Sequence, residues 1–334
     1  MLTSKNISLL PYNSFHLEVS AAEYVSVKSV NDLQDVLNQK TPLLILGGGS
    51  NVLLTKNIEG LVLKIDIGGI DEVKEDNTQI FVRAGAGENW HTFVSYTMKR
   101  NWGGLENLSL IPGNVGAAPI QNIGAYGVEF RDSFYELEAY DRKEKKVYSF
   151  GVNDCQFGYR DSIFKSAEKG RYIILNVTFV LRKTPLLHTS YGAIREELKK
   201  MGIQSPTIQD VSQAVINIRR SKLPDPAEIG NAGSFFKNPV VDQAKFLSLS
   251  AKNPDLPAYP HEDKFVKLAA GWLIEQCGWK GYRKGDAGVH KDQALVLVNY
   301  GKATGREILE LSEKIEASVH RKFGVGLERE VNVF

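Results

Sequence analysis

The sequence has few of the features that mark secreted, membrane-spanning or nucleic-acid-binding proteins. It contains two cysteines, Cys155 and Cys277, which are too few for a disulfide framework or a cysteine metal cluster. No segment reaches the roughly 18 uninterrupted apolar residues needed to cross a bilayer. The net charge of +2 provides no excess of positive charge for non-specific nucleic-acid binding. We therefore expect a cytoplasmic monomer with no membrane, nucleic-acid or metal partner.

Length and composition indicate a globular protein of more than one domain. A chain of 334 residues exceeds what one hydrophobic core usually holds. Its hydrophobic share of 43% and charged share of 24% are ordinary for globular proteins. Hydrophobic periodicity predicts helices mixed with strands, in an α+β order. The predicted helices cover residues 31–38, 89–101, 192–201, 207–221, 263–277 and 304–323, and the predicted strands cover residues 43–46, 52–54, 61–65, 134–140, 147–150, 171–182, 293–299 and 325–333.

Local signals refine some of these elements. Asn31 and Thr304 are expected to cap the helices that follow them, and Gly278 and Gly324 are expected to end helices. Residues 171–182 are apolar on both faces, which predicts a central strand covered on both sides.

A glycine-rich stretch, residues 103–130, has a composition of its own. Between Leu105 and Gly127 it contains no Lys, Arg or Asp, and Glu106 is its single charge. Repeated Gly and Ala remove side-chain bulk, so the backbone is able to lie against a large flat partner. The segment is too irregular for one helix or strand and too apolar for a solvated loop. It is either a buried connection or one wall of a cofactor site.

A second glycine-rich segment, residues 47–51, lies between two predicted strands. A dinucleotide-binding Rossmann unit requires a helix after its glycines, so this order disfavours that fold. Successive backbone N–H groups in a glycine turn form a nest for phosphate, and Ser50 and Asn51 add side-chain donors. An ordinary hairpin turn is the alternative.

Three further side chains are candidates for chemistry. Arg160 stands between Tyr159 and Asp161, and is either a surface ion-pairing residue or a guanidinium held toward an anion. Ser234 precedes two phenylalanines, and is either a turn-capping hydroxyl or a proton donor kept dry. Glu330 lies on a predicted strand, and is either an edge charge or a positioned acid.

In order along nearly the whole chain, these motifs closely resemble the UDP-N-acetylenolpyruvoylglucosamine reductase (UDP-N-acetylmuramate dehydrogenase) family. The matching segments are residues 46–51, 111–127, 159–160, 233–239 and 327–331. Residues 189–192, Thr-Ser-Tyr-Gly, resemble the substrate loop of the longer subtype.

The resemblance implies an α+β fold with a FAD-binding region of the vanillyl-alcohol-oxidase (PCMH) type. It implies two FAD-binding subdomains, residues 1–66 and 67–218, and a substrate-binding domain, residues 219–334, whose last strand returns to the first subdomain. The residues that it places on FAD are Gly47, Gly48, Gly49, Ser50, Asn51, Ile111, Pro112, Gly113, Gly116, Ala117, Gln121, Asn122, Gly124, Ala125, Tyr126 and Arg219. Those that it places on the substrate are Tyr191, Lys222, Asn238, Tyr259, Lys267 and Gln293.

The resemblance also implies the reaction. NADPH would reduce the flavin, and hydride would then reach the methylene carbon of the enolpyruvyl group of a UDP-sugar. Arg160 and a protonated Glu330 would stabilise the enolate-like charge, and Ser234 would protonate the adjacent carbon. Members often carry arginine two residues after the glutamate, whereas this chain has Asn332.

Two alternatives stay open from the sequence. An oxygen-using flavin oxidase of the same fold often holds its flavin covalently through His or Cys, and residues 47–51 and 103–127 contain neither. This absence predicts a non-covalently bound FAD. A non-catalytic nucleotide-binding protein gives no reason for Arg160, Ser234 and Glu330 to occur together.

Overall fold

The computed structural model describes residues 3–261 and 263–334, and the chain divides into two compact units. Unit 1 contains the described part of Met1–Ile7 together with Ala21–Gly48 and Ile58–Ser221. Unit 2 contains Ser8–Ser20, Gly49–Asn57 and Lys222–Phe334. The glycine loop 47–51 therefore contributes its first two residues to unit 1 and its last three to unit 2.

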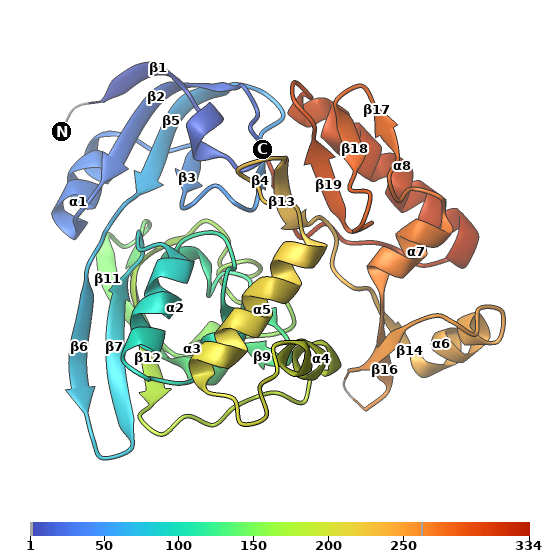
Figure 1. Ribbon diagram of the computed structural model, residues 1–334. Helices are drawn as coiled ribbons and strands as arrows, with labels where there is room; N and C mark the ends of the chain where they lie inside the picture. Colours follow the sequence, from blue (N-terminus) through green and yellow to red (C-terminus); the bar gives the residue numbers. More distant parts are fainter. Residues whose placement is uncertain (1–2, 262) are drawn as a thin grey trace. The chain divides into compact units, whose positions relative to one another are not determined.

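The first sheet of unit 1 has the strand order β1-β2-β5-β3, with β5 parallel to both β2 and β3. Its strands are β1 (Ser4–Ser8), β2 (Ser20–Val27), β5 (Ile58–Ile65) and β3 (Leu44–Leu46). Helix α1 (Val30–Gln39) follows β2 (Figure 1). The prediction that Asn31 caps this helix was wrong. Ser29 is the cap, because its hydroxyl accepts the N–H of Asp32 at 3.1 Å and Asn31 already lies in the first turn.

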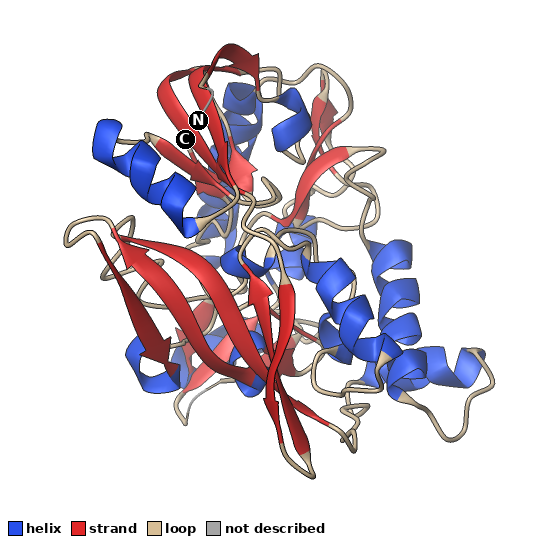
Figure 2. Ribbon diagram, turned by 90° about the vertical axis from the view of Figure 1, so that its left-hand side faces the viewer, coloured by secondary structure: helices blue, strands red, loops and turns tan. Residues whose placement is uncertain are grey.

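The second sheet of unit 1 is antiparallel and has the order β11-β10-β12-β7-β6. Its strands, the long twisted ribbons in the lower part of Figure 2, are β6 (Ile70–Glu75), β7 (Gln79–Gly85), β10 (Phe134–Asp141), β11 (Lys146–Gly151) and β12 (Tyr172–Arg182). Strand β12 pairs with β10 on one side and β7 on the other, which confirms the central strand predicted from its two-sided apolar pattern.

Short elements complete unit 1. The helices are α2 (Trp90–Lys99), α3 (Val152–Cys155), α4 (Gly192–Lys200) and α5 (Ile208–Lys222). The glycine-rich stretch forms no long element. It contains 3₁₀ turns at Glu106–Leu108, Val115–Ala117 and Phe130–Ser133 and the two-residue strands β8 (Gly124–Ala125) and β9 (Val128–Glu129).

The described residues of unit 2 form three small sheets. The four-stranded sheet has the order β13-β19-β18-β17, the three-stranded sheet has the order β14-β16-β15, and β20 pairs with β4. These strands are β4 (Val52–Leu53), β13 (Gly230–Ser234), β14 (Val240–Asp242), β15 (Ala258–Pro260), β16 (Phe265–Leu268), β17 (Arg283–Lys284), β18 (Ala287–Val289), β19 (Val296–Asn299) and β20 (Asn332–Val333). The helices are α6 (Gln243–Ser250), α7 (Ala270–Gln276) and α8 (Gly305–Phe323).

Helix α8 confirms the predicted caps. Thr304 forms a capping box with Glu307, and Gly324 ends the helix at φ +60°. Among the residues that the structure describes, no helix combines the length and apolarity needed to cross a bilayer.

Two predicted elements of unit 2 were wrong. Residues 263–277 were expected to form one helix, but Phe265–Leu268 is strand β16 and the helix begins only at Ala270. The reason is non-local, because β16 pairs with β14 on one side and β15 on the other. The strand expected over residues 293–299 begins at Val296, since the carbonyl of Gln293 accepts the N–H of Val296 in a turn at 3.0 Å.

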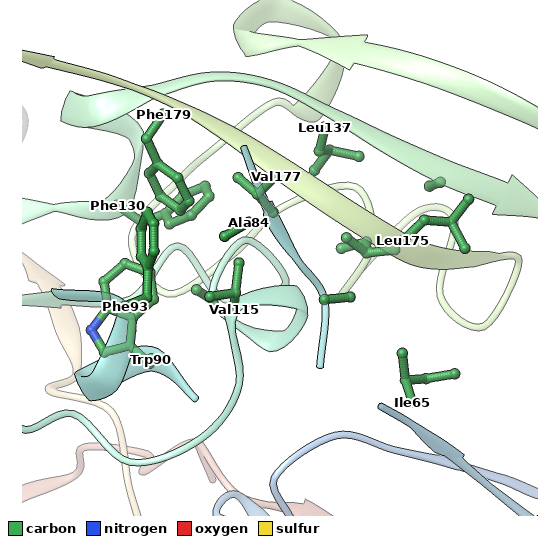
Figure 3. Close-up of a cluster of buried hydrophobic side chains, with 14 of the residues drawn as sticks. Ile65, Ala84, Trp90, Phe93, Val115, Phe130, Leu137, Leu175, Val177 and Phe179 are labelled. Carbon is green, nitrogen blue, oxygen red and sulfur yellow. The ribbon is translucent and has the colours of Figure 1, made fainter. Parts of the chain in front are cut away.

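An aromatic cluster lies at the centre of the unit 1 core (Figure 3). Phe179 on β12 is fully buried, and its ring centroid lies 4.8 Å from that of Phe93 and 5.9 Å from that of Trp90, both on α2. Phe130, the end of the glycine-rich stretch, lies 5.6 Å from the same ring. The cluster therefore anchors both ends of the segment that joins α2 to the second sheet.

Replacing Phe179 by Ala should lower the free energy of unfolding by about 3–5 kcal/mol, because it opens a cavity among Trp90, Phe93 and Phe130. Urea unfolding followed by circular dichroism measures this loss. Val147→Ala on β11 is the control, since Val147 is 41% exposed and its truncation should cost less than about 1 kcal/mol. Equal losses in the two variants would contradict this description of the core.

Candidate functional site

The two glycine-rich segments lie against each other in unit 1. A Cβ added to Gly48 would lie 2.7 Å from Oδ1 of Asn114 and 2.8 Å from Cα of Gly113. A Cβ added to Gly47 would lie 3.8 Å from the Cβ of Ala117, which is ordinary van der Waals contact. Only glycine allows this approach at position 48, because Cβ contacts below 3.0 Å do not occur in proteins. A cradle with little side-chain bulk is thus formed by Gly47, Gly48, Gly113 and Ala117, from segments more than 60 positions apart in the sequence.

The remaining loop residues belong to unit 2. Gly49 has φ +66°, and a Cβ there would lie 1.9 Å from the carbonyl oxygen of Tyr12. Both the conformation and the contact require glycine at this position. Ser50 and Asn51 keep partial solvent exposure.

The glycine-rich stretch has a buried half and an exposed half. All residues from Leu105 to Ser109 are buried. Of the ten candidate cofactor residues between Ile111 and Tyr126, only Asn122 is buried, and the other nine keep partial or full exposure. The expected FAD-contacting segment therefore presents its backbone and small side chains outward, which an internal connection would not do.

Asn122 is the exception because its side chain holds the stretch together. Its Nδ2 donates to the carbonyl of Gly158 and to Oε2 of Glu129, both at 3.0 Å, and its Oδ1 accepts the N–H of Arg131 at 3.1 Å. These three bonds use both N–H donors and the oxygen of its amide. Asn122 thereby ties the stretch to the turn that carries Arg160.

Arg160 lies directly on the glycine-rich stretch. Gly158 and Asp161 form a bridge around it, and its own backbone has φ +53°. Its Nη2 donates to the carbonyl of Gly124 at 2.5 Å, and its Nη1 lies 2.9 Å from the position of a Cβ on Gly124. The guanidinium carbon lies 5.5 Å from the Tyr159 ring centroid. The structure thus holds this cation beside the exposed half of the stretch.

Arg219, Tyr126 and Tyr191 form a second cluster in unit 1. Burial lowers the pKa of Arg219 from its ordinary value, although a hydrogen bond to Tyr126 opposes this. Burial raises the pKa of Tyr126. The Tyr126 and Tyr191 rings meet edge to face at 5.5 Å, and the Tyr191 side chain is 43% exposed. A candidate cofactor residue and a candidate substrate residue are therefore in direct contact.

Asn107, which the sequence reasoning missed, supports this cluster. Its Nδ2 donates to the carbonyls of Tyr126 at 3.0 Å and His188 at 2.9 Å, and the residue is 1% exposed. It joins the stretch to the segment that leads to Tyr191. One sequence feature could have identified Asn107: it is a polar residue next to Glu106, the single charged residue of an otherwise apolar stretch.

In unit 2, Ser234 ends strand β13 opposite Val296 of β19. Gly233 before it has φ +69° and donates its N–H to Oδ1 of Asn231 at 2.9 Å. Phe235 and Phe236 after it are buried, while Ser234 is partly exposed. The hydroxyl is thus fixed on a sheet beside an apolar core.

Glu330 does not lie on the continuous strand that was predicted over residues 325–333. Arg329 forms an isolated bridge with Phe236, and the strand β20 begins only at Asn332. The N–H of Glu330 donates to the carbonyl of Phe235 at 2.9 Å, so the acid is attached to the residue after Ser234. The prediction failed because residues 325–333 do not pair with one strand: Arg329 pairs with Phe236, whereas Asn332 pairs with Val52.

Asn51 and Asn332 fix the same segment. The Nδ2 of Asn51 donates to the carbonyl of Glu330 at 3.2 Å. The backbone N–H and the Nδ2 of Asn332 each donate to the carbonyl of Asn51 at 3.1 Å. Asn332, the departure from the family pattern, therefore joins the glycine loop to the backbone around Glu330.

The candidate substrate residues of unit 2 lie in four places. Tyr259 and Lys267 are directly opposite each other on β15 and β16. Asn238 accepts the N–H of Ala270 on its Oδ1 at 3.0 Å, which holds the start of α7. Gln293 accepts the N–H of Leu295 on its Oε1 at 3.4 Å, and Lys222 is exposed at the end of α5.

Comparisons with known proteins identify the family. Residues 225–334 match the model of the UDP-N-acetylenolpyruvoylglucosamine reductase C-terminal domain, and residues 21–147 match that of an FAD binding domain. UDP-N-acetylenolpyruvoylglucosamine reductase of Pseudomonas fluorescens Pf-5 is 50% identical over 333 residues, covering 98% of each chain. The enzyme of the same name from Flavobacterium johnsoniae is 50% identical over 336 residues, covering 100% of both. The chain belongs to this family.

A solved structure supports the fold. UDP-N-acetylenolpyruvylglucosamine reductase from Thermus caldophilus matches with a TM-score of 0.69 at 22% identity, over 100% of both chains. With the FAD binding domain match, this confirms the expected α+β FAD-binding fold.

The residues of unit 1 suit a bound FAD. The cradle formed by Gly47, Gly48, Gly113 and Ala117 has no side chain longer than a methyl group, and the exposed half of the stretch continues from it. Bare backbone is what a pyrophosphate and a flat ring system need for close approach. Among the residues that the structure describes, no group of three or more His, Cys, Asp or Glu side chains is arranged to hold a metal ion.

Replacing Asn122 by Ala should lower the free energy of unfolding by about 2–4 kcal/mol, because three hydrogen bonds made by a fully buried side chain are lost. Urea unfolding measures the loss, and hydrogen exchange should become faster in the turn at residues 158–161. Asn217→Ala is the control, since its amide makes two partly exposed bonds, accepting from Gln213 at 2.8 Å and donating to Glu197 at 3.0 Å, and should cost at most about 1 kcal/mol. Unchanged exchange in that turn would contradict the role given to Asn122.

Proposed function

We propose that this protein reduces the enolpyruvyl group of UDP-N-acetylglucosamine enolpyruvate to give UDP-N-acetylmuramate, with NADPH as reductant and FAD as bound cofactor. This is an early step of peptidoglycan synthesis. The observation that carries the proposal is 50% identity over the full length of reductases of this name. The reaction adds a hydride and a proton across a carbon–carbon double bond, and NADPH becomes NADP⁺.

The two glycine-rich segments and Arg219 are proposed to hold the cofactor. The glycine loop 47–51 is proposed to receive the pyrophosphate, with donors from its backbone and from Ser50 and Asn51. The exposed half of the glycine-rich stretch and Arg219 are proposed to lie along the rest of FAD. When bound, FAD supplies the hydride-transfer chemistry that links NADPH to the sugar nucleotide. The absence of His and Cys from both segments supports non-covalent binding.

Arg160 is proposed to stabilise the negative charge that develops on the enolpyruvyl carboxylate. A guanidinium stays protonated at all relevant pH values and binds carboxylate in two-point geometry. Its bond to the carbonyl of Gly124 fixes it before the substrate arrives, so little reorganisation is needed during the reaction.

Ser234 is proposed to donate the proton to the carbon that does not receive hydride. A serine hydroxyl is a weak acid, but a carbon-centred enolate is a strong enough base to take its proton. Phe235 and Phe236 are buried whereas Ser234 keeps partial exposure, so the bound substrate and cofactor would have to exclude water from this hydroxyl. Glu330, in its protonated form, is proposed to stabilise the same enolate, and its bond to the carbonyl of Phe235 ties it to the serine segment.

Tyr191, Lys222, Asn238, Tyr259, Lys267 and Gln293 are proposed to bind the sugar nucleotide. Lys267 and Tyr259, neighbours across two strands, suit a diphosphate and a polar or stacked ring. Tyr191 is exposed and packs against Tyr126, as expected for a side chain that closes over the bound substrate.

We further propose that residues 1–66 and 67–218 act as two FAD-binding subdomains and residues 219–334 as the substrate domain. The protein is proposed to work in the cytoplasm as a monomer, with no membrane or nucleic-acid partner. An oxygen-using oxidase is not favoured, because the curated relatives named here are reductases.

Replacing Ser234 by Ala should leave the bleaching of the flavin absorbance by NADPH intact and lower turnover of the sugar nucleotide by about 10²–10⁴-fold. Stopped-flow absorbance measures the two processes separately. Ser250→Ala on α6 is the control and should behave as wild type. Full turnover by the Ser234 variant would show that the proton comes from elsewhere.

A further inference from the structure

Leu110 has an unusual backbone at the point where the buried half of the glycine-rich stretch meets the exposed half. Its φ is +59°, in the left-handed region that side-chain-bearing residues rarely occupy. The next residue, Ile111, begins the segment expected to contact FAD. At the negative φ values that leucine prefers, the chain would leave Leu110 in another direction, and the segment after it would be displaced.

Hydrogen bonds from two helices hold Leu110 in this conformation. Its N–H donates to Nδ1 of His91 on α2 at 3.0 Å, and its carbonyl accepts from Nε of Arg219 on α5 at 3.2 Å. The two helices lie alongside each other (Figure 1), and Nε2 of Gln209 on α5 donates to the carbonyl of Met98 on α2 at 2.8 Å. Both backbone polar groups of Leu110 are therefore fixed from outside the stretch.

The residues before Leu110 are held by the same helices. Nε1 of Trp90 donates to the carbonyl of Leu108 at 2.8 Å, and the hydroxyls of Ser109 and Ser212 lie 2.7 Å apart. These hydrogen bonds from α2 and α5 form a clamp on three consecutive residues, Leu108, Ser109 and Leu110. We call it the α2–α5 clamp, and Ile111 is the first residue after it.

His91 can accept this bond only as a neutral imidazole with its proton on Nε2. Burial lowers the pKa of His91, and the positive charges of Arg220 and Arg219 lower it further. These two arginines of α5 are the charged groups that act on it among the described residues. The surroundings thus favour the form that the bond needs.

We propose that His91 is a positioning residue for FAD: its imidazole fixes Leu110 in the left-handed conformation and so presets the backbone at residues 111–114 to receive the cofactor. This inference rests on the proposed function. Positioning the FAD-binding backbone is separate from the roles proposed for Arg160, Ser234 and Glu330. His91 itself is not expected to touch the substrate.

The first test is a double-mutant cycle with His91→Ala and Leu110→Gly. FAD affinity is measured on the holoenzyme by dilution, from the flavin fluorescence that appears on release. His91→Ala should weaken FAD binding about tenfold, the size of one hydrogen bond. Glycine adopts the left-handed conformation without cost, so His91→Ala should change affinity less than about twofold in the Leu110→Gly background. Equal losses in both backgrounds would overturn the inference.

A matched control separates this effect from general loosening of the chain. Asn101 at the end of α2 also has a left-handed backbone, with φ +59°, but it lies before the glycine-rich stretch. Asn101→Gly should not restore FAD affinity to the His91→Ala variant. Restoration by both glycine substitutions would show a general stability effect and would overturn the inference.

The second test uses pH and a conservative variant. Protonation removes the acceptor on Nδ1, so wild-type FAD affinity should be constant at neutral pH and should fall only in acid, because burial holds the pKa of His91 below the ordinary histidine range. His91→Gln offers an amide oxygen that does not titrate, and it should retain affinity while losing this dependence. An identical pH profile in the glutamine variant would contradict the inference.

The outcomes distinguish this inference from the proposed function. Wild-type protein that binds no FAD would refute the proposed function itself. Yellow, active wild type together with a His91→Ala variant of equal FAD affinity would refute only the role of His91.

Discussion

The structure depends on close contact between two stretches of backbone that carry almost no side chains. Gly48 meets Gly113 and Asn114 at distances that exclude a Cβ. This contact joins the end of one predicted strand to the middle of the glycine-rich stretch. The neighbouring features of unit 1 then hold that stretch in place. Asn122 ties it to the Arg160 turn, Asn107 ties it to the Tyr191 segment, and the α2–α5 clamp fixes its entry at Leu110.

In unit 2, a few hydrogen bonds to the backbone link the residues that are proposed to act in the reaction. The N–H of Glu330 bonds to the residue after Ser234, and Asn51 and Asn332 bond around the backbone of the acid. A loop residue expected to bind a cofactor therefore also positions the segment of a candidate catalytic acid.

Local signals were sufficient for much of the fold and for the candidate residues. The capping box at Thr304, the glycine at 324 and the two-sided apolar pattern of β12 depend on neighbours in the sequence, and the structure confirms them. Features set by distant partners were not predictable. Phe265–Leu268 has helical spacing but pairs with two remote strands, and the bond from Leu110 to His91 joins residues whose contact no local pattern indicates.

We propose that this chain holds a non-covalent flavin, which NADPH reduces and which an enolpyruvyl sugar nucleotide reoxidises. The visible spectrum of the purified protein, recorded without oxygen, tests this most directly. We predict a yellow protein that NADPH bleaches, that the sugar nucleotide restores, and that releases FAD on denaturation. A folded protein without colour, or a bleached protein that oxygen restores rapidly without the sugar nucleotide, would contradict the account.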